Sequence, residues 1–184
     1  MATLFFSFIH EDLRETNLVR DFVQRALSFQ IDSFLSCDET QSDAGEDGMK
    51  HVFAELNDAK VLLAMLSPES VKRPWIHFEA GAAWMSGKAV IPVCYGGIDV
   101  GDLPKPYSGL EATDVQTFDG LHSLACSTAR YLDLPKPRRP VFEDDPDPIF
   151  LGADGIAGNQ RLFEPYRDLH SFFESKNIIR NLQS

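Results

Sequence analysis

Paired cysteines, positive charge and long apolar runs are all scarce in this 184-residue sequence. Its cysteines, Cys37, Cys94 and Cys126, are odd in number and widely spaced, which argues against a disulfide framework or a zinc site. The 17 Lys and Arg against 28 Asp and Glu leave a net charge of -11, which disfavours nucleic acids and anionic membrane surfaces as partners. No apolar run approaches the roughly 20 residues that span a bilayer, and the N-terminus lacks the basic start of a signal peptide. These absences predict a cytoplasmic protein with reduced thiols.

What the sequence does contain is a regular alternation of apolar patterns up to residue 132. Short runs rich in β-favouring residues predict strands over 3–9, 31–37, 60–67, 89–95 and 111–118. Apolar residues at helical spacing predict helices over 14–29, 49–59, 73–84 and 119–132. Strands that alternate with helices in this way indicate a single α/β domain, whose parallel sheet has helices on both faces.

The loops that follow the strands are the first places to look for a site, because ligands of such sheets bind at the carboxyl ends of the strands. These candidate loops span 8–13, 38–48, 67–74 and 95–110. In the first of them, we expect Glu11 and Asp12 to face solvent or to cap the following helix.

The alternating pattern breaks near residue 134. The chain beyond it is rich in proline and acidic residues at first, and then becomes helix-like. We therefore predict a domain over 1–134, followed by a proline-rich arm and C-terminal helical extension over 135–184.

One carboxylate, Glu79, stands within a stretch that is otherwise apolar almost all the way round, RPWIHFEAGAAW at 73–84. Helical spacing predicts that Trp75, Phe78 and Ala82 share its face. Because an unpaired carboxylate in such surroundings is destabilising, the position of Glu79 needs an explanation.

Two explanations of Glu79 remain open on spacing alone. In the structural one, Glu79 pairs with Arg73 or Lys72, or accepts hydrogen bonds from a neighbouring loop. In the functional one, Glu79 meets a ligand in a cleft, and Trp75 supplies a flat stacking surface one turn earlier. A stacking surface beside a carboxylate suits a ligand with a planar cationic ring and sugar hydroxyls.

Two stretches of the chain carry a resemblance to a known family. They are LFFSFIHED near the N-terminus and DETQSDAGEDGMKHVFAELNDAKVLLAMLSPESVKRPWIHFEAGAAW, where Leu-Ser-Pro, Pro-Trp and Trp-x-x-x-Glu stand at characteristic separations. From about residue 3 to 132 the chain resembles a TIR (Toll/interleukin-1 receptor) domain of the bacterial NAD-consuming, Thoeris-like anti-phage kind.

The resemblance implies a flavodoxin-like sheet and NAD+ glycohydrolase or ADP-ribosyl cyclase activity, with NAD+ as the substrate and with neither a cofactor nor a metal. Glu79 matches the family's catalytic glutamate. The positions that match substrate-binding residues are Ser7, Phe8, Asp38, Gly45, Ser67 and Trp75. Family members also self-associate through TIR–TIR contacts, and a separate effector can read the product.

A single carboxylate is enough for this chemistry, because nicotinamide leaves NAD+ as a neutral molecule and needs no general acid. Glu79 would then stabilise an oxocarbenium-like transition state in a site poor in water. Capture by water gives ADP-ribose and internal capture gives a cyclic isomer, a choice that the sequence leaves open. Two alternatives also stay open: a non-catalytic TIR adaptor that acts by assembly, and a nucleoside deoxyribosyltransferase-like enzyme.

Overall fold

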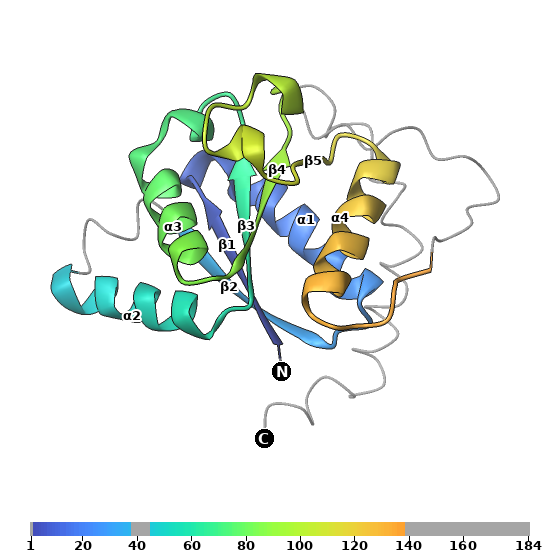
Figure 1. The fold of residues 1–184 in the computed structure, drawn as a ribbon, viewed down its shortest axis with the longest axis horizontal. Helices are drawn as coiled ribbons and strands as arrows, with labels where there is room; N and C mark the ends of the chain where they lie inside the picture. The colour runs from blue at the N-terminus through green and yellow to red at the C-terminus, as the bar shows by residue number, and fades with distance from the viewer. Residues whose placement is uncertain (1, 38–44, 139–184) are drawn as a thin grey trace.

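Figure 1 shows the computed structural model, which describes residues 2–37 and 45–138. Within these residues, five parallel strands form one sheet in the order β2-β1-β3-β4-β5. The strands are β1 (Ala2–Phe8), β2 (Ile31–Cys37), β3 (Val61–Leu66), β4 (Ala89–Cys94) and β5 (Thr113–Asp114). This order confirms the flavodoxin-like parallel sheet that the sequence predicted.

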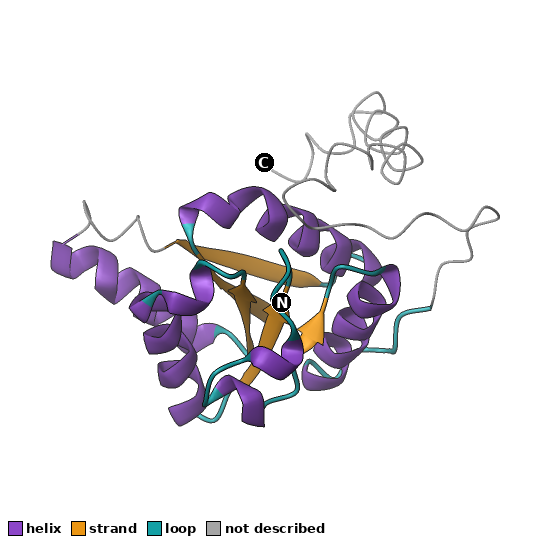
Figure 2. Ribbon diagram, turned by 90° about the horizontal axis from the view of Figure 1, so that it is seen from above, coloured by secondary structure: helices purple, strands orange, loops and turns teal. Residues whose placement is uncertain are grey.

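Helices cover both faces of the sheet, as Figure 1 and the view from above in Figure 2 show. The α-helices are α1 (Leu13–Ala26), α2 (Gly45–Asp58), α3 (Pro74–Met85) and α4 (Phe118–Tyr131). Short 3-10 turns are η1 (His10–Asp12), η3 (Ser70–Lys72), η4 (Val100–Asp102) and η5 (Tyr107–Gly109). Helices α1 and α4 pack on one face, and α2 and α3 pack on the other, so each face has its own apolar core.

Strand β1 shows how the sheet divides its side chains between the two cores. Because successive side chains of a strand point to opposite faces, Phe6 and Phe8 enter the core under α1 and α4. Phe5 and Ile9 enter the core under α2 and α3. Ser7 is fully buried, and its place in the alternation puts it on the α2/α3 face.

Strand β3 occupies the middle of the sheet, and all of its residues are buried. A strand covered on both faces needs apolar side chains at every position, which explains the continuous run VLLAML.

Two predicted boundaries are wrong. Helix α2 begins at Gly45, four residues before the predicted start at residue 49, and the two glycines in its first turn hid that start because glycine is a poor helix former. Strand β5 is Thr113–Asp114 alone, because the Asp114 carboxylate accepts the Gln116 backbone N–H at 2.9 Å and turns the chain away.

The predicted extension over 135–184 lies outside the described residues beyond residue 138, so its boundary with the domain stays a prediction. None of the helices in the described part of the chain is long and apolar enough to cross a membrane.

Candidate active site

Glu79 lies on the inner side of α3, where its side chain is 0% exposed. Its Oε2 accepts a hydrogen bond from the Ser7 hydroxyl, and its Oε1 accepts one from the Ser36 hydroxyl at 2.5 Å. The two serines come from neighbouring strands and are register partners in the parallel pairing of β1 with β2. The carboxylate is therefore anchored at both oxygens by the sheet beneath it.

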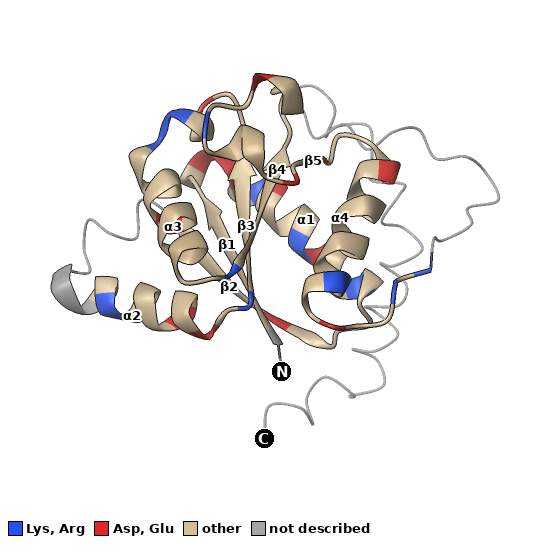
Figure 3. Ribbon diagram, viewed as in Figure 1, with Lys and Arg blue, Asp and Glu red and all other residues tan. Residues whose placement is uncertain are grey.

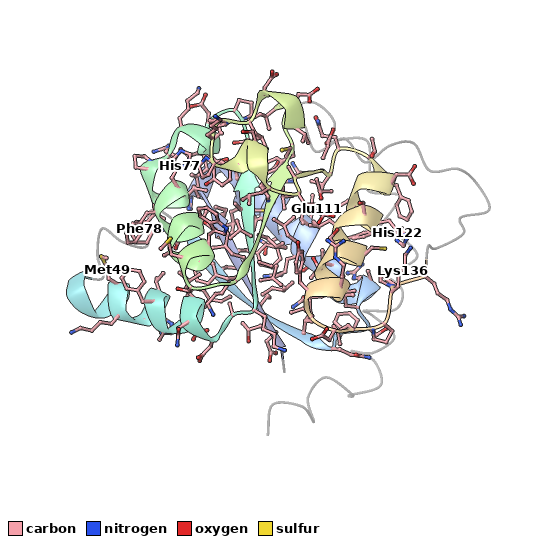
Figure 4. All side chains as sticks on the ribbon, viewed as in Figure 1. Met49, His77, Phe78, Glu111, His122 and Lys136 are labelled. Carbon is pink, nitrogen blue, oxygen red and sulfur yellow. The ribbon has the colours of Figure 1, made fainter. Side chains whose placement is uncertain are left out.

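The buried face of α3 differs from the predicted one. It consists of Ile76, Glu79, Ala80 and Ala83, whereas Phe78 is 48% exposed on the outer side of the helix, as Figure 4 shows. By helical spacing, Glu79 can be grouped with the predicted face or with the observed buried face. Figure 3 shows α3 almost without charge, because Glu79 is its one charged residue. A helix that is apolar all round carries no pattern that selects its inner face.

The cations that could have paired with Glu79 bond other carboxylates. The Arg73 guanidinium contacts Glu11 at 2.9 Å, and the Lys72 ammonium contacts Glu69 at 3.0 Å. The hydrogen bonds that Ser7 and Ser36 give to Glu79 come from uncharged hydroxyls, which orient the carboxylate. Such a fixed, water-poor anion is suited to stabilising a positive charge that develops on a substrate.

Trp75 lies one turn before Glu79 on α3, as the sequence predicted, and its side chain is half-buried. Its ring centroid is 5.3 Å from that of Phe78, which in turn lies 5.8 Å from Phe53 of α2. Its indole N–H is buried and has no hydrogen-bond partner among the described residues. Trp75 therefore offers both a flat ring and an unused donor.

Phe8 and Ser67 do not join Glu79. The Phe8 side chain is 2% exposed and belongs to the core under α1 and α4, on the opposite face of the sheet. The Ser67 hydroxyl donates to the Asp12 carboxylate at 2.8 Å.

That contact also corrects the expectation for the first loop. Asp12 stands at the N-cap position of α1, but its side chain makes no capping hydrogen bond and is only partly exposed. Glu11 is exposed, as expected, and pairs with Arg73.

Two predicted positions cannot be placed around the carboxylate. Asp38 lies outside the described residues. Gly45 is the first residue of α2, on a different element from Glu79. Their roles in binding stay predictions.

Two residues near Glu79 escaped the sequence reasoning. Ser36 could have been found, because the pairing of two predicted parallel strands places it beside Ser7. Tyr107 comes from the loop between β4 and β5, is 1% exposed, and has its hydroxyl 3.2 Å from His77 Nδ1. Burial, and secondly the charge of Glu79, raise the pKa of Tyr107 above its usual value. No local pattern marks such a loop residue.

A pocket of about 170 Å³ lies between α3 and the η5 loop. Ala80, Gly81 and Trp84 line it from the helix, and Tyr107 and Leu110 line it from the loop. Glu79 does not line this pocket, although its neighbours Ala80 and Tyr107 do.

Comparison with known proteins agrees with the fold. The family model described as TIR domain matches residues 4–125, a span that begins within β1, ends within α4 and contains Ser7, Ser36 and Glu79. No curated protein is similar enough to the chain to count as a match. Because the family model covers well over half of the sequence, the chain belongs to the TIR domain family.

Proposed function

We propose that this TIR domain cleaves the bond between nicotinamide and ribose in NAD+, with Glu79 as the catalytic carboxylate. The observation that carries the proposal is a buried carboxylate whose two oxygens are held by the hydroxyls of Ser7 and Ser36. Burying a carboxylate in an apolar helix is costly, and apolar side chains would fill the same space without that cost, so packing alone gives no reason for a carboxylate here. A preorganised anion instead serves a reaction in which positive charge develops.

The reaction needs little beyond this anion. The C1′–N bond breaks with its electron pair going to the pyridinium nitrogen, so nicotinamide leaves neutral and the positive charge moves to the ribosyl group. Glu79 stabilises that charge electrostatically, which is worth most where water is excluded. Ser7 and Ser36 hold the carboxylate in one orientation before the substrate arrives. Trp75 would stack on the planar leaving group.

The ribosyl cation is then captured by a nucleophile. Water forms a new C1′–O bond, releases a proton and yields ADP-ribose. An adenine nitrogen or a ribose hydroxyl of the same molecule yields a cyclic isomer. We propose that the product is a signal in bacterial anti-phage immunity, that a separate effector reads it, and that activity depends on TIR–TIR assembly. The resemblance to the NAD-consuming members supports these three roles.

Incubation with NAD+, followed by separation of products by chromatography and mass, tests the proposal. Wild-type protein should release nicotinamide, and Glu79→Gln should lower the rate on the order of 10²-fold or more. Glutamine matches glutamate in shape and can still accept a hydroxyl hydrogen bond, so circular dichroism should be unchanged. Glu69→Gln, on an exposed glutamate that pairs with Lys72, is the matched control and should retain the full rate.

Other outcomes identify the alternatives. An assembled wild-type sample that releases no nicotinamide contradicts the proposal and favours an adaptor. Cleavage of deoxynucleosides without cleavage of NAD+ favours a deoxyribosyltransferase-like enzyme.

A further inference from the structure

Helix α3 carries two side chains that hydrogen-bond other elements in the described part of the chain, Glu79 and His77. They stand two residues apart, so a helix with 3.6 residues per turn directs them about 160° apart around its axis. Glu79 accepts hydroxyls from β1 and β2. His77 has its Nδ1 3.2 Å from the hydroxyl of Tyr107, the first residue of η5. The helix is therefore held on two different sides.

Apolar packing is incomplete on the His77 side of α3. By helical spacing, His77, Ala80, Gly81 and Trp84 form one stripe of the helix. The last three of these line the pocket of about 170 Å³ between α3 and the η5 loop. A pocket at this place offers few contacts that would resist a small rotation of the helix. A hydrogen bond is directional, whereas apolar contact is not, so the Tyr107–His77 contact can fix the rotation on this side.

The loop that carries Tyr107 is itself fixed in place. Ile98, Leu103 and the Tyr107 ring are buried in the core under α2 and α3. The Leu110 backbone N–H donates to the Tyr107 carbonyl at 2.9 Å and closes the η5 turn. The rings of Tyr107 and His77 also contact each other, with their centroids 5.4 Å apart. The hydroxyl thus projects from a fixed support, and its removal alone should leave the loop in place.

The position of Glu79 is sensitive to the rotation of α3. A carboxylate about 6 Å from the helix axis moves by about 1 Å when the helix turns by about 10°. Misplacement of a catalytic group by about 1 Å can lower a rate on the order of 10²-fold. Burial, and secondly the charge of Glu79, raise the pKa of Tyr107, so the hydroxyl lies near enough to the carboxylate to sense its charge. Loss of the Tyr107–His77 contact would therefore be felt at Glu79.

We propose that Tyr107 is a positioning residue for the cleavage of NAD+: its hydroxyl, bonded to His77, fixes the rotation of α3 and so the place of the Glu79 carboxylate. This role rests on the proposed function, because the carboxylate to be placed is the catalytic one. Either partner can donate the hydrogen bond, depending on which nitrogen of the His77 ring carries the hydrogen. Tyr107 acts through the helix and needs no contact with the substrate.

The two tryptophans of the chain, Trp75 and Trp84, both lie on α3, so their indole N–H signals in an NMR spectrum report on this helix without turnover. Single phenylalanine substitutions assign the two signals. Trp84 lines the pocket beside Tyr107, whereas Trp75 stands on the Glu79 side by helical spacing. Tyr107→Phe keeps the ring and removes the hydroxyl, and it should shift both signals. Tyr131→Phe, which removes the hydroxyl of an exposed tyrosine on α4, is the matched control and should shift neither.

Kinetics of nicotinamide release test the consequence for the reaction. Tyr107→Phe should lower kcat about three- to tenfold while KM changes little, and Tyr131→Phe should keep the full rate. His77→Leu should give the same loss, and the double variant with Tyr107→Phe should lose no more than either alone, because both remove one contact. His77→Asn should recover much of the rate, since an amide can bond the Tyr107 hydroxyl from the place of Nδ1. In the Glu79→Gln background, Tyr107→Phe should lower the residual rate no further.

Three results would overturn the positioning role. They are an unmoved Trp75 signal in Tyr107→Phe, equal kcat values for wild type and Tyr107→Phe, or a double variant whose loss is the product of the two single losses. Should Tyr107→Phe fail to fold by circular dichroism, His77→Leu takes its place. The indole signals separate the two proposals. A shifted Trp75 signal without release refutes the cleavage activity but not the hold of Tyr107 on α3, and equal release by wild type and Tyr107→Phe refutes the positioning role alone.

Discussion

Glu79 and Asp12 are both carboxylates bonded by serine hydroxyls, and the contrast between them shows how burial divides two tasks. Glu79 is 0% exposed and accepts a hydroxyl at each oxygen, from Ser7 and Ser36. Asp12 is partly exposed and accepts the Ser67 hydroxyl at 2.8 Å, with the Tyr95 hydroxyl beside it. A buried carboxylate held at both oxygens is suited to act through its charge, whereas the partly exposed Asp12 ties the segment after β1 to the segment after β3.

Removing the two serine hydroxyls that donate to Glu79 should give the largest effect. In Ser7→Ala/Ser36→Ala, the buried carboxylate loses two charge-assisted hydrogen bonds, so the free energy of unfolding should fall by about 3–6 kcal/mol. Urea denaturation measures the loss. Adding Glu79→Leu to this variant should restore part of the stability, because the uncompensated charge is then gone. A double variant as stable as wild type would show that the serines do not support the carboxylate.

Removing one donor should affect the rate more than the affinity. Ser36→Ala removes the hydrogen bond to Glu79 Oε1 and loosens the carboxylate, so kcat for nicotinamide release should fall about tenfold while KM changes little. Ser33→Ala is the matched control on the same strand, since the Ser33 hydroxyl bonds Gln24 and not Glu79. Equal kcat values for the two variants would contradict the positioning role of Ser36.

The corresponding change at Asp12 should be milder. Ser67→Ala removes the hydroxyl that donates to the partly exposed Asp12 and accepts the Ser70 backbone N–H at 3.2 Å, and the free energy of unfolding should fall by about 1–2 kcal/mol. Urea denaturation of wild type and Ser67→Ala gives the difference. A loss as large as that of the double serine variant would remove the contrast between the two carboxylates.

The smallest effect should be a change of protein stability with pH that is caused by the protonation of Asp12. Burial raises the pKa of Asp12 above 3.8, so the folded protein holds this proton more tightly than the unfolded chain. The contribution of Asp12 to stability is therefore complete below pH 3.8 and is lost as the pH rises through the folded-state pKa. Asp12→Asn has no such group, so the stability of wild type relative to this variant should fall across that interval. Urea denaturation at a series of pH values would show it, and a relative stability that rises with pH would have the wrong sign.

The sequence predicted the sheet well because its strands carry strong local patterns. The continuous apolar run of β3 and the proline that begins α3 each restrict the local structure. Glu79 stood out for a similar reason, as a lone acid in an apolar helix. The face that it occupies could not be predicted, because α3 offers the same apolar character on every side. The inner face of α3 is set by contacts with Ser7 and Ser36 on the sheet below. Such contacts join segments that are far apart in the sequence.

The remaining surprises are also contacts between distant segments. Asp12 and Ser67 lie 55 positions apart in the chain, and their hydrogen bond depends on the neighbouring places of β1 and β3. Tyr107 reaches His77 from a loop that has no periodic pattern. Phe8 was placed near the site through a resemblance, whereas strand alternation, applied strictly, sends it to the opposite face from Ser7.

Gly81 is a position on α3 where a substitution should be tolerated. A methyl group built at Gly81 would meet nothing within 4 Å, although the residue stands only two positions after the buried carboxylate. Its backbone needs no conformation that is reserved for glycine, and alanine is favoured over glycine within a helix by about 1 kcal/mol. Alanine can therefore stand at position 81, where an isotope-labelled methyl group would report movements of α3 during turnover while Glu79 stays in place.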